Sequence, residues 1–215
     1  MPPLRRLLLY ASLAIAAGCG HGSKPEPLPT PTEHSLAGLA AQHVVMLPTY
    51  AVRVVPPLLW NSAIGRPTDV QRTLDADILA AFEDRGIRKN WIFPDDLAQS
   101  YKRNSMYATD PYALAEEPLR SPGLFLDARL PDPLATQLRT LIALHEETWL
   151  VLASMELRFE QAGSGGRGVL RLVLVDPRFS AVRWIGEIAS DTASTFGPVI
   201  SASIAAKLAG IVSIQ

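Results

Sequence analysis

The sequence has little of what metal, redox and nucleic-acid sites require. It holds one cysteine and four histidines among 215 residues, and a single cysteine excludes a disulfide framework and any cysteine-rich metal or iron–sulfur centre. Its formal net charge of −1 gives no basic footprint for a nucleic-acid partner. No uncharged apolar run approaches the ~20 residues that a membrane-spanning helix requires. The sequence therefore predicts no metal site, no cofactor, no nucleic-acid partner and no membrane-spanning helix.

Apolar residues, in contrast, are plentiful. They make up 48% of the chain, while charged residues make up 19%, a balance that allows a packed core. The length suits one ordinary domain with accessory segments. We therefore expect a folded domain rather than a disordered chain.

Residues 1–18 are typical of an export signal. Arg5 and Arg6 precede a run of uncharged, mostly apolar residues over 7–18, which is too short to cross a hydrocarbon core of ~30 Å. These two arginines are the only charged residues in the segment, so the remaining chain carries 18 basic and 21 acidic residues and a net charge of −3. We expect this segment to be removed before the domain functions.

Cys19 follows the apolar run directly. The stretch Ala16-Ala17-Gly18-Cys19 resembles the lipobox of bacterial lipoproteins, in which a peptidase cleaves before the cysteine and the thiol carries a diacylglycerol. The resemblance implies that Cys19 is lipidated and attaches the protein to a bilayer through acyl chains, each buried methylene contributing about 0.8 kcal/mol. Gly20 follows the cysteine, and the absence of an aspartate there implies sorting to the outer membrane, with the domain facing the periplasm.

Residues 19–42 are predicted to form a tether. Proline occupies every second position from Pro25 to Pro31, which favours an extended, stiff backbone. At ~3.1 Å per residue, such a segment could hold the domain up to ~70 Å from the membrane. A spacer that lets the domain reach a partner and a generic stalk without one both fit this pattern. We expect a short helix to begin within 35–42.

Residues 43–215 are predicted to form one α/β globular domain. Apolar periodicity indicates strands over 43–48, 53–60, 89–94, 149–160, 169–175 and 182–188, and helices over 68–85, 95–103, 133–145 and 198–211. Turn residues join the last three strands, which should form an antiparallel meander. We expect a mixed α+β architecture of three layers, in which helices pack on both faces of a single mixed sheet.

Three local patterns refine this outline. Thr68 and Gln71 have the spacing of a capping box at the start of a helix. Asp95 and Asp96 open the next helix, where carboxylates oppose the positive end of the helix dipole; a pair of catalytic acids is the alternative. In the strand 149–160, the odd-numbered apolar residues are expected to share one face.

Two stretches partly match cofactor or metal motifs. The glycines of 163–168 fit the pattern G-x-G-x-x-G, but a strand follows them where a nucleotide site requires a helix, so they indicate a hairpin turn. His145-Glu146-Glu147 begins like the helix of a zinc protease, but Trp149 stands where the second histidine belongs. Neither stretch predicts a cofactor-binding or metal-ligating residue.

Two further patterns bear on catalysis. Ser203 and Lys207 are four residues apart, one more than in the serine–lysine motif of acylating enzymes. Asp176 ends a strand, but Pro177 follows it, which indicates a turn. No catalytic residue is predicted, and Cys19 is the single predicted site, a site of lipidation.

Five stretches of the domain, together with the lipobox, carry a wider resemblance. They are Met46-Leu47-Pro48, Phe82–Ile87, Trp149–Leu152, Leu174–Arg178 and Trp184–Glu187. In these features the chain resembles a group of envelope lipoproteins that includes the penicillin-binding-protein activator LpoB, the curli-secretion protein CsgG and the N-terminal domain of TolB. The resemblance implies a three-layer α/β domain and a non-catalytic role through protein partners. The segment 104–130 is not part of the shared pattern.

We therefore expect an outer-membrane lipoprotein that is not an enzyme. It would act as a binding or scaffolding module for an envelope partner, such as cell-wall or secretion machinery. Two alternatives stay open. One is a small periplasmic hydrolase or transferase that uses His145, Glu146, Glu147 and residues of 104–130. The other is a ligand-binding lipoprotein with a pocket under 104–130, a connection of unusual length for a compact domain.

Overall fold

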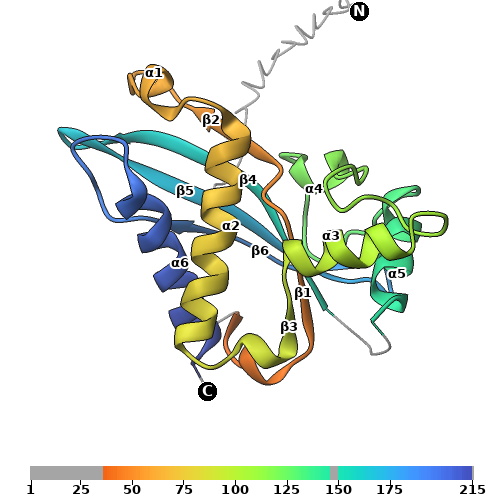
Figure 1. Cartoon of the computed structure of the whole chain (residues 1–215). Coiled ribbons are helices and arrows are strands. Elements are labelled where there is room, and N and C mark those ends of the chain that lie inside the picture. Colours follow the sequence, from red (N-terminus) through yellow and green to blue (C-terminus); the bar gives the residue numbers. More distant parts are fainter. Residues whose placement is uncertain (1–35, 146–149, 215) are drawn as a thin grey trace, which may run out of the picture. The chain divides into compact units, whose positions relative to one another are not determined.

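The computed structural model describes residues 36–145 and 150–214 (Figure 1). Cys19, the export signal and most of the tether lie outside these residues, as do Glu146, Glu147 and Trp149. The helices are α1 (Asn61–Ile64), α2 (Pro67–Asp84), α3 (Pro94–Arg103), α4 (Glu117–Arg120), α5 (Leu134–Ala143) and α6 (Pro198–Val212). The strands are β1 (Val44–Leu47), β2 (Ala51–Val54), β3 (Trp91–Ile92), β4 (Leu150–Ala162), β5 (Gly165–Asp176) and β6 (Ala181–Ala189). Short 3-10 turns cover Leu39–Ala41 and Arg88–Asn90.

The described strands form one mixed sheet in the order β3-β1-β4-β5-β6. β1 lies parallel to β3 and to the first half of β4, while β2 pairs in parallel with the second half of β4. The pairs β4–β5 and β5–β6 are antiparallel. The mixed α+β sheet and the predicted meander are thus confirmed.

Two helical layers cover the sheet. α2 and α6 lie side by side on one face (Figure 1), and α3, α4 and α5 pack with their connections on the other. Each layer has its own apolar cluster. In the first, the ring of Phe82 meets those of Trp91 and Phe93 edge to face, with centroids 4.7 and 5.5 Å apart. In the second, Leu119 and Leu138 are fully buried.

A β-bulge divides β4 into two halves, and the odd-numbered side chains of the two halves point to opposite faces of the sheet. The pairing of β4 with β5 shifts register between Ser154 and Glu156. Before the shift, Val151 packs into the α3–α5 layer; after it, Leu157 and Phe159 pack into the α2–α6 layer. The prediction that the odd-numbered residues share one face is wrong beyond the bulge, because the extra residue reverses the alternation.

The start of α2 also differs from the prediction. The helix begins at Pro67, whose fixed φ suits the first helical position, so Thr68 lies within the first turn. Gln71 does not close a capping box: its Nε2 donates a 2.7 Å hydrogen bond to the carbonyl oxygen of Tyr50. Gly86, with a φ of 67°, follows the end of the helix as predicted.

Packing against the core begins before residue 43. Leu36 and Leu39 are buried in the cluster of the α2–α6 layer, and Gly38 N donates a 2.9 Å hydrogen bond to the carbonyl oxygen of Ile214. The last residues assigned to the tether by sequence therefore pack near the C-terminal end of α6. The strand expected over 53–60 is shorter and begins earlier, as β2. Residues 61–64, which lie between the predicted strand and the predicted helix over 68–85, form α1.

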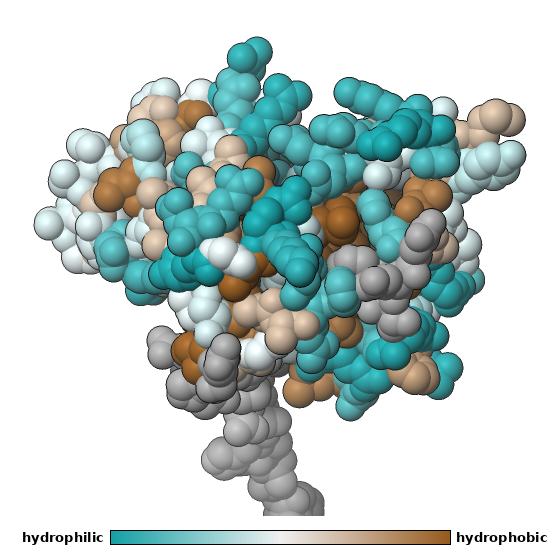
Figure 2. Space-filling view, turned by 60° about the horizontal axis from the view of Figure 1, so that its bottom comes forward, coloured by the Kyte–Doolittle hydropathy of each residue, from teal (hydrophilic) through white to brown (hydrophobic). Residues whose placement is uncertain are grey.

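On the face shown in Figure 2, hydrophilic residues predominate and the hydrophobic ones form small, separate areas. Within 36–145 and 150–214, no helix combines the length and the apolarity needed to cross a membrane.

Candidate functional site

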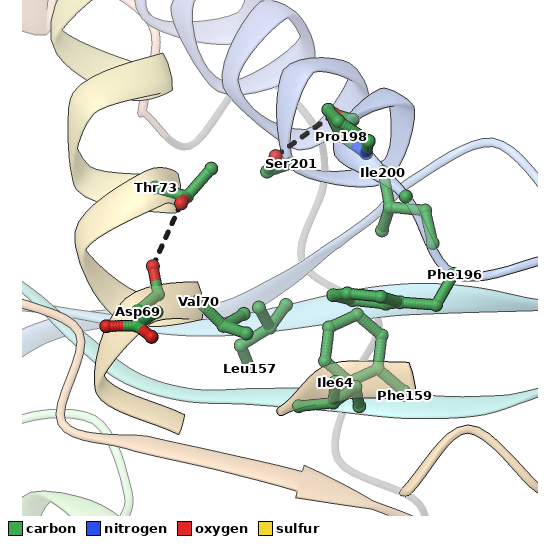
Figure 3. A pocket seen from close by; sticks show the side chains of 11 residues that line it. Ile64, Asp69, Val70, Thr73, Leu157, Phe159, Phe196, Pro198, Ile200 and Ser201 are labelled. Atoms are coloured by element: carbon green, nitrogen blue, oxygen red, sulfur yellow. Dashed lines mark hydrogen bonds between the residues drawn. The ribbon is translucent and has the colours of Figure 1, made fainter. Parts of the chain in front are cut away.

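An apolar pocket of about 230 Å³ opens where α2 and α6 begin (Figure 3). The second half of β4 forms its floor, and the first turns of the two helices form its walls. It is lined by Ile64, Asp69, Val70, Thr73, Leu157, Phe159, Phe196, Gly197, Pro198, Ile200 and Ser201. A cavity of about 150 Å³ in a protein core admits benzene. This pocket is therefore large enough for a branched aliphatic or aromatic side chain.

Local chain geometry creates the space. α2 and α6 start with Pro67 and Pro198, each after a residue in extended conformation. Past its bulge, β4 turns Leu157 toward these helices. Gly168 on β5 sets how closely α6 approaches the sheet, because a Cβ at that position would lie 2.7 Å from Cγ2 of Ile200.

Two aromatic rings, those of Phe159 and Phe196, line the pocket, and the Trp60 ring packs against both of them. Trp60, Phe159 and Phe196 meet edge to face, with ring centroids 5.4 to 6.1 Å apart, a favoured aromatic geometry. Gly166 makes room for this group of three rings, since a Cβ there would lie 2.8 Å from the Trp60 ring. Gly163 lies in the predicted hairpin turn between β4 and β5, but the turn is shorter than expected. Gly165, Gly166 and Gly168 belong to β5, where they allow close packing.

The polar groups at the pocket are already bonded within the protein. Thr73 Oγ1 donates a 2.9 Å hydrogen bond to the Asp69 carbonyl oxygen. Ser201 Oγ donates one of 3.0 Å to the Pro198 carbonyl oxygen. The Asp69 carboxylate pairs with the Arg66 guanidinium at 2.9 Å. A ligand in this pocket would therefore gain free energy mainly from burying apolar surface, and little from polar contacts.

His145, the centre of the catalytic alternative, belongs to the other layer. It follows α5, and burial lowers the pKa of its imidazole, against the raising effect of the Asp96 carboxylate. Asp96 itself has a structural role, because its Oδ2 accepts hydrogen bonds from Phe93 N and from Arg88. Glu146 and Glu147 lie outside the described residues. His145 does not line the pocket.

The segment 104–130 also packs in the α3–α5 layer. Three of its leucines, Leu114, Leu119 and Leu124, are buried in that layer's cluster. Its Met106 and Tyr107 are exposed. The pocket between α2 and α6 is therefore a different place from the one under 104–130 that the sequence suggests.

The remaining motif residues have structural partners. Ser203 and Lys207 both bond the Asp191 carboxylate, at 2.9 and 2.8 Å, and so join α6 to the chain after β6. Asp176 Oδ1 accepts a 3.1 Å hydrogen bond from Arg178 N. Burial of Asp176 raises its pKa, but the hydrogen bonds and charge of Arg178 outweigh burial and lower the pKa overall. These contacts are those of a turn aspartate.

Sequence reasoning missed a buried polar cluster at the bulge of β4. Asp75 on α2 is only 8% exposed. Its Oδ1 accepts hydrogen bonds from Thr49 N and Oγ1, at 3.2 and 2.9 Å, and Thr49 Oγ1 lies 2.8 Å from Ser154 Oγ. Burial raises the pKa of Asp75 to about 7, against the lowering effect of the Thr49 hydrogen bonds. The available signal was the place of Asp75 beside Leu74 in the apolar stripe of α2.

In the described part of the chain, no group of three or more histidine, cysteine, aspartate or glutamate side chains is arranged to hold a metal ion. Sequence comparison finds no matching protein-family model and no matching curated protein. Comparison with solved structures matches this chain to a chain of the PelC dodecamer from Paraburkholderia phytofirmans, with 13% identity, a TM-score of 0.32 and coverage of 81% of this chain and 90% of that one. A point variant of that dodecamer matches with 12% identity, the same TM-score of 0.32 and coverage of 79% and 93%. At these values the likeness carries no conclusion about function or assembly, and the resemblance to the LpoB, CsgG and TolB group stays a prediction.

Proposed function

We propose that this protein is an outer-membrane lipoprotein whose domain is a non-catalytic binding module for a protein partner in the cell envelope. The pocket at the starts of α2 and α6 receives an apolar side chain of that partner. The observation that carries this proposal is the pocket itself, with its apolar floor and its internally bonded polar groups.

The pocket has the properties of an interface anchor site. Its deep residues Leu157, Phe159 and Ile200 are 1%, 1% and 2% exposed and are held by core packing, so binding orders few side chains. Burying one large apolar side chain contributes about 1.5–3 kcal/mol, and such anchors carry much of the energy of protein interfaces. The partner side chain that fills the pocket can therefore contribute enough free energy to determine whether the partner binds.

The proposed attachment to the membrane through a lipid is supported by the sequence alone. Residues 1–18 are typical of an export signal, and Ala16-Ala17-Gly18-Cys19 resembles a lipobox. Cys19→Ser should move the protein out of the membrane fraction or leave it uncleaved. Unchanged fractionation with membranes would contradict lipid attachment.

Photo-crosslinking tests the binding site in cells. A small photoreactive side chain, a leucine analogue that carries a diazirine and leaves the opening free, is placed at Thr73, an exposed residue that lines the pocket. The control is the same side chain at Ala80, which is exposed on the same helix but does not line the pocket. We expect one envelope protein, identified by mass spectrometry, to couple to position 73 and not to position 80. Equal yields at both positions, or no adduct at either, would contradict the proposed site.

A further inference from the structure

The outer edge of β6 is open over most of its length in the part of the chain that the structure describes. Residues 127–130 cover only its beginning, where Val182 N donates a 3.0 Å hydrogen bond to the Ala128 carbonyl oxygen. Over 183–189, no described strand other than β5 pairs with β6. An open edge presents backbone N–H and C=O groups to which another strand can bond.

The sequence of this open stretch complements itself. From Arg183 to Glu187 it reads Arg-Trp-Ile-Gly-Glu. When two copies pair antiparallel about Ile185, Arg183 lies opposite the partner's Glu187, and Trp184 lies opposite the partner's Gly186. Opposite charges stabilise cross-strand pairs, and so does an aromatic ring beside a glycine. The stretch therefore fits a second copy of itself in one register.

The backbone geometry agrees with this register. Ser190 N donates a 2.8 Å hydrogen bond to the Gly168 carbonyl oxygen on the β5 side. Because hydrogen-bonded and non-bonded positions alternate along an antiparallel pair, the even-numbered residues from Trp184 to Ile188 bond to β5. The N–H and C=O groups of Ile185 and Glu187 therefore point to the open edge. The register shift beside Arg183 reverses this pattern at Val182, which bonds residues 127 and 128 instead. Two Ile185 residues on a two-fold axis can then exchange both backbone hydrogen bonds.

The charged side chains are accessible and already part of ion pairs. Arg183 is paired with Asp127 at 2.8 Å, and Glu187 accepts a 2.7 Å hydrogen bond from Arg158. The side chains of Arg183 and Glu187 are 40% and 42% exposed. In the paired arrangement, Asp127, Arg183, the partner's Glu187 and the partner's Arg158 form a row of alternating charge. Such alternation favours this register over those that place like charges opposite each other.

We propose that the open edge of β6 is a self-association surface, through which two copies of this chain pair antiparallel about Ile185 and continue one sheet across a two-fold axis. A two-fold arrangement uses the same stretch of both copies, so every contact is made twice. The dimer carries two pockets of the kind described above.

Mixing two charge-reversed variants tests the register. In the full chain in detergent, Arg183→Glu and Glu187→Arg each place like charges opposite each other twice, so each variant alone should dimerise at least tenfold more weakly than the wild type. In a mixture of the two, every facing pair is again of opposite sign. Sedimentation should then show a heterodimer with a dissociation constant within threefold of the wild-type value.

Each reversal also removes an ion pair within the chain, so thermal unfolding of both variants checks that they fold. Failure of the mixture to dimerise would overturn the register. A wild-type chain that stays monomeric, or an assembly that neither reversal weakens, would overturn the proposal as a whole.

Disulfide trapping in membranes gives a second measurement that leaves the charges untouched. Directly opposed, hydrogen-bonded residues have Cα atoms about 5.5 Å apart, which lies within the range of a disulfide. We expect Ile185→Cys to form a disulfide-linked dimer under mild oxidation. Val199→Cys, at an exposed position on α6, and the wild-type chain should not. Equal dimer yields from the three chains would contradict the two-fold pairing.

Discussion

The two helical layers of this domain are built differently. The α2–α6 layer consists of helices of 18 and 15 residues whose apolar side chains follow the helical period. In the other layer, α3 and α5 have 10 residues each and α4 has 4, and irregular segments join them. Long straight helices cannot follow every contour of a twisted sheet, whereas short segments can. The pocket lies where the two long helices begin, at the margin of the regular layer.

The largest effect is expected from a fully buried ring of the regular layer, near the end of α2. Phe82 is fully buried against Trp91 and Phe93, and Phe82→Ala should lower the free energy of unfolding by about 3–5 kcal/mol. Tyr107→Ala removes a ring that is 78% exposed in the other layer and should change it by less than about 0.5 kcal/mol. Urea denaturation measures both. A loss below about 1 kcal/mol for Phe82→Ala would contradict the tight packing of this ring against Trp91 and Phe93.

A pH-dependent effect of similar size is expected at Asp75, where the regular layer meets the bulge. Its pKa rises from an ordinary 3.8 to about 7 on folding, so folding favours the protonated carboxyl. The stability from this preference is complete below about pH 4 and is lost as the pH rises through 7. At about 1.4 kcal/mol per pKa unit, the loss amounts to at most about 4 kcal/mol.

Asp75→Asn removes this titration and keeps an oxygen that can accept the Thr49 hydrogen bonds. Unfolding free energies at pH 4.5, 6 and 8 should show the wild type losing stability relative to the variant as the pH rises. A difference that is constant across this range would show that Asp75 does not titrate as described.

A smaller effect is expected from two glycines beside the pocket. A Cβ at Gly168 would lie 2.7 Å from Ile200, whereas one at Gly197 would meet nothing within 4 Å. Gly168→Ala should therefore cost about 1–3 kcal/mol through overpacking, and Gly197→Ala should cost almost nothing. Thermal unfolding of the two variants checks this. Equal melting temperatures would mean that Ile200 and α6 can move away from β5 at no cost in stability.

Sequence periodicity predicts the regular layer better than the rest of the fold. Val70, Leu74, Ile78 and Phe82 form the buried stripe of α2, as their spacing indicates. The bulge between Ser154 and Glu156 could not be predicted, because a single extra residue in a strand leaves no mark in composition. It moves Leu157 and Phe159 to the other face, and these residues form the floor of the pocket.

The candidate site was beyond sequence reasoning for a related reason. A pocket is space left by packing, and no residue type marks it. The turn roles of Asp176 and Gly163 are local and follow from their neighbours in the chain. The contact of Trp60 with Phe159 and Phe196 joins three distant segments, and only the fold reveals it.

The most direct test of the account is the affinity of the captured envelope partner for variants of the pocket mouth. Thr73→Trp places a bulky ring at the opening, and Ala80→Trp adds the same ring at an exposed position farther along α2. We predict that Thr73→Trp weakens binding at least tenfold with an unchanged melting temperature, while Ala80→Trp leaves the dissociation constant as it is. Equal affinities for the two variants would contradict the central claim that this pocket is the binding site.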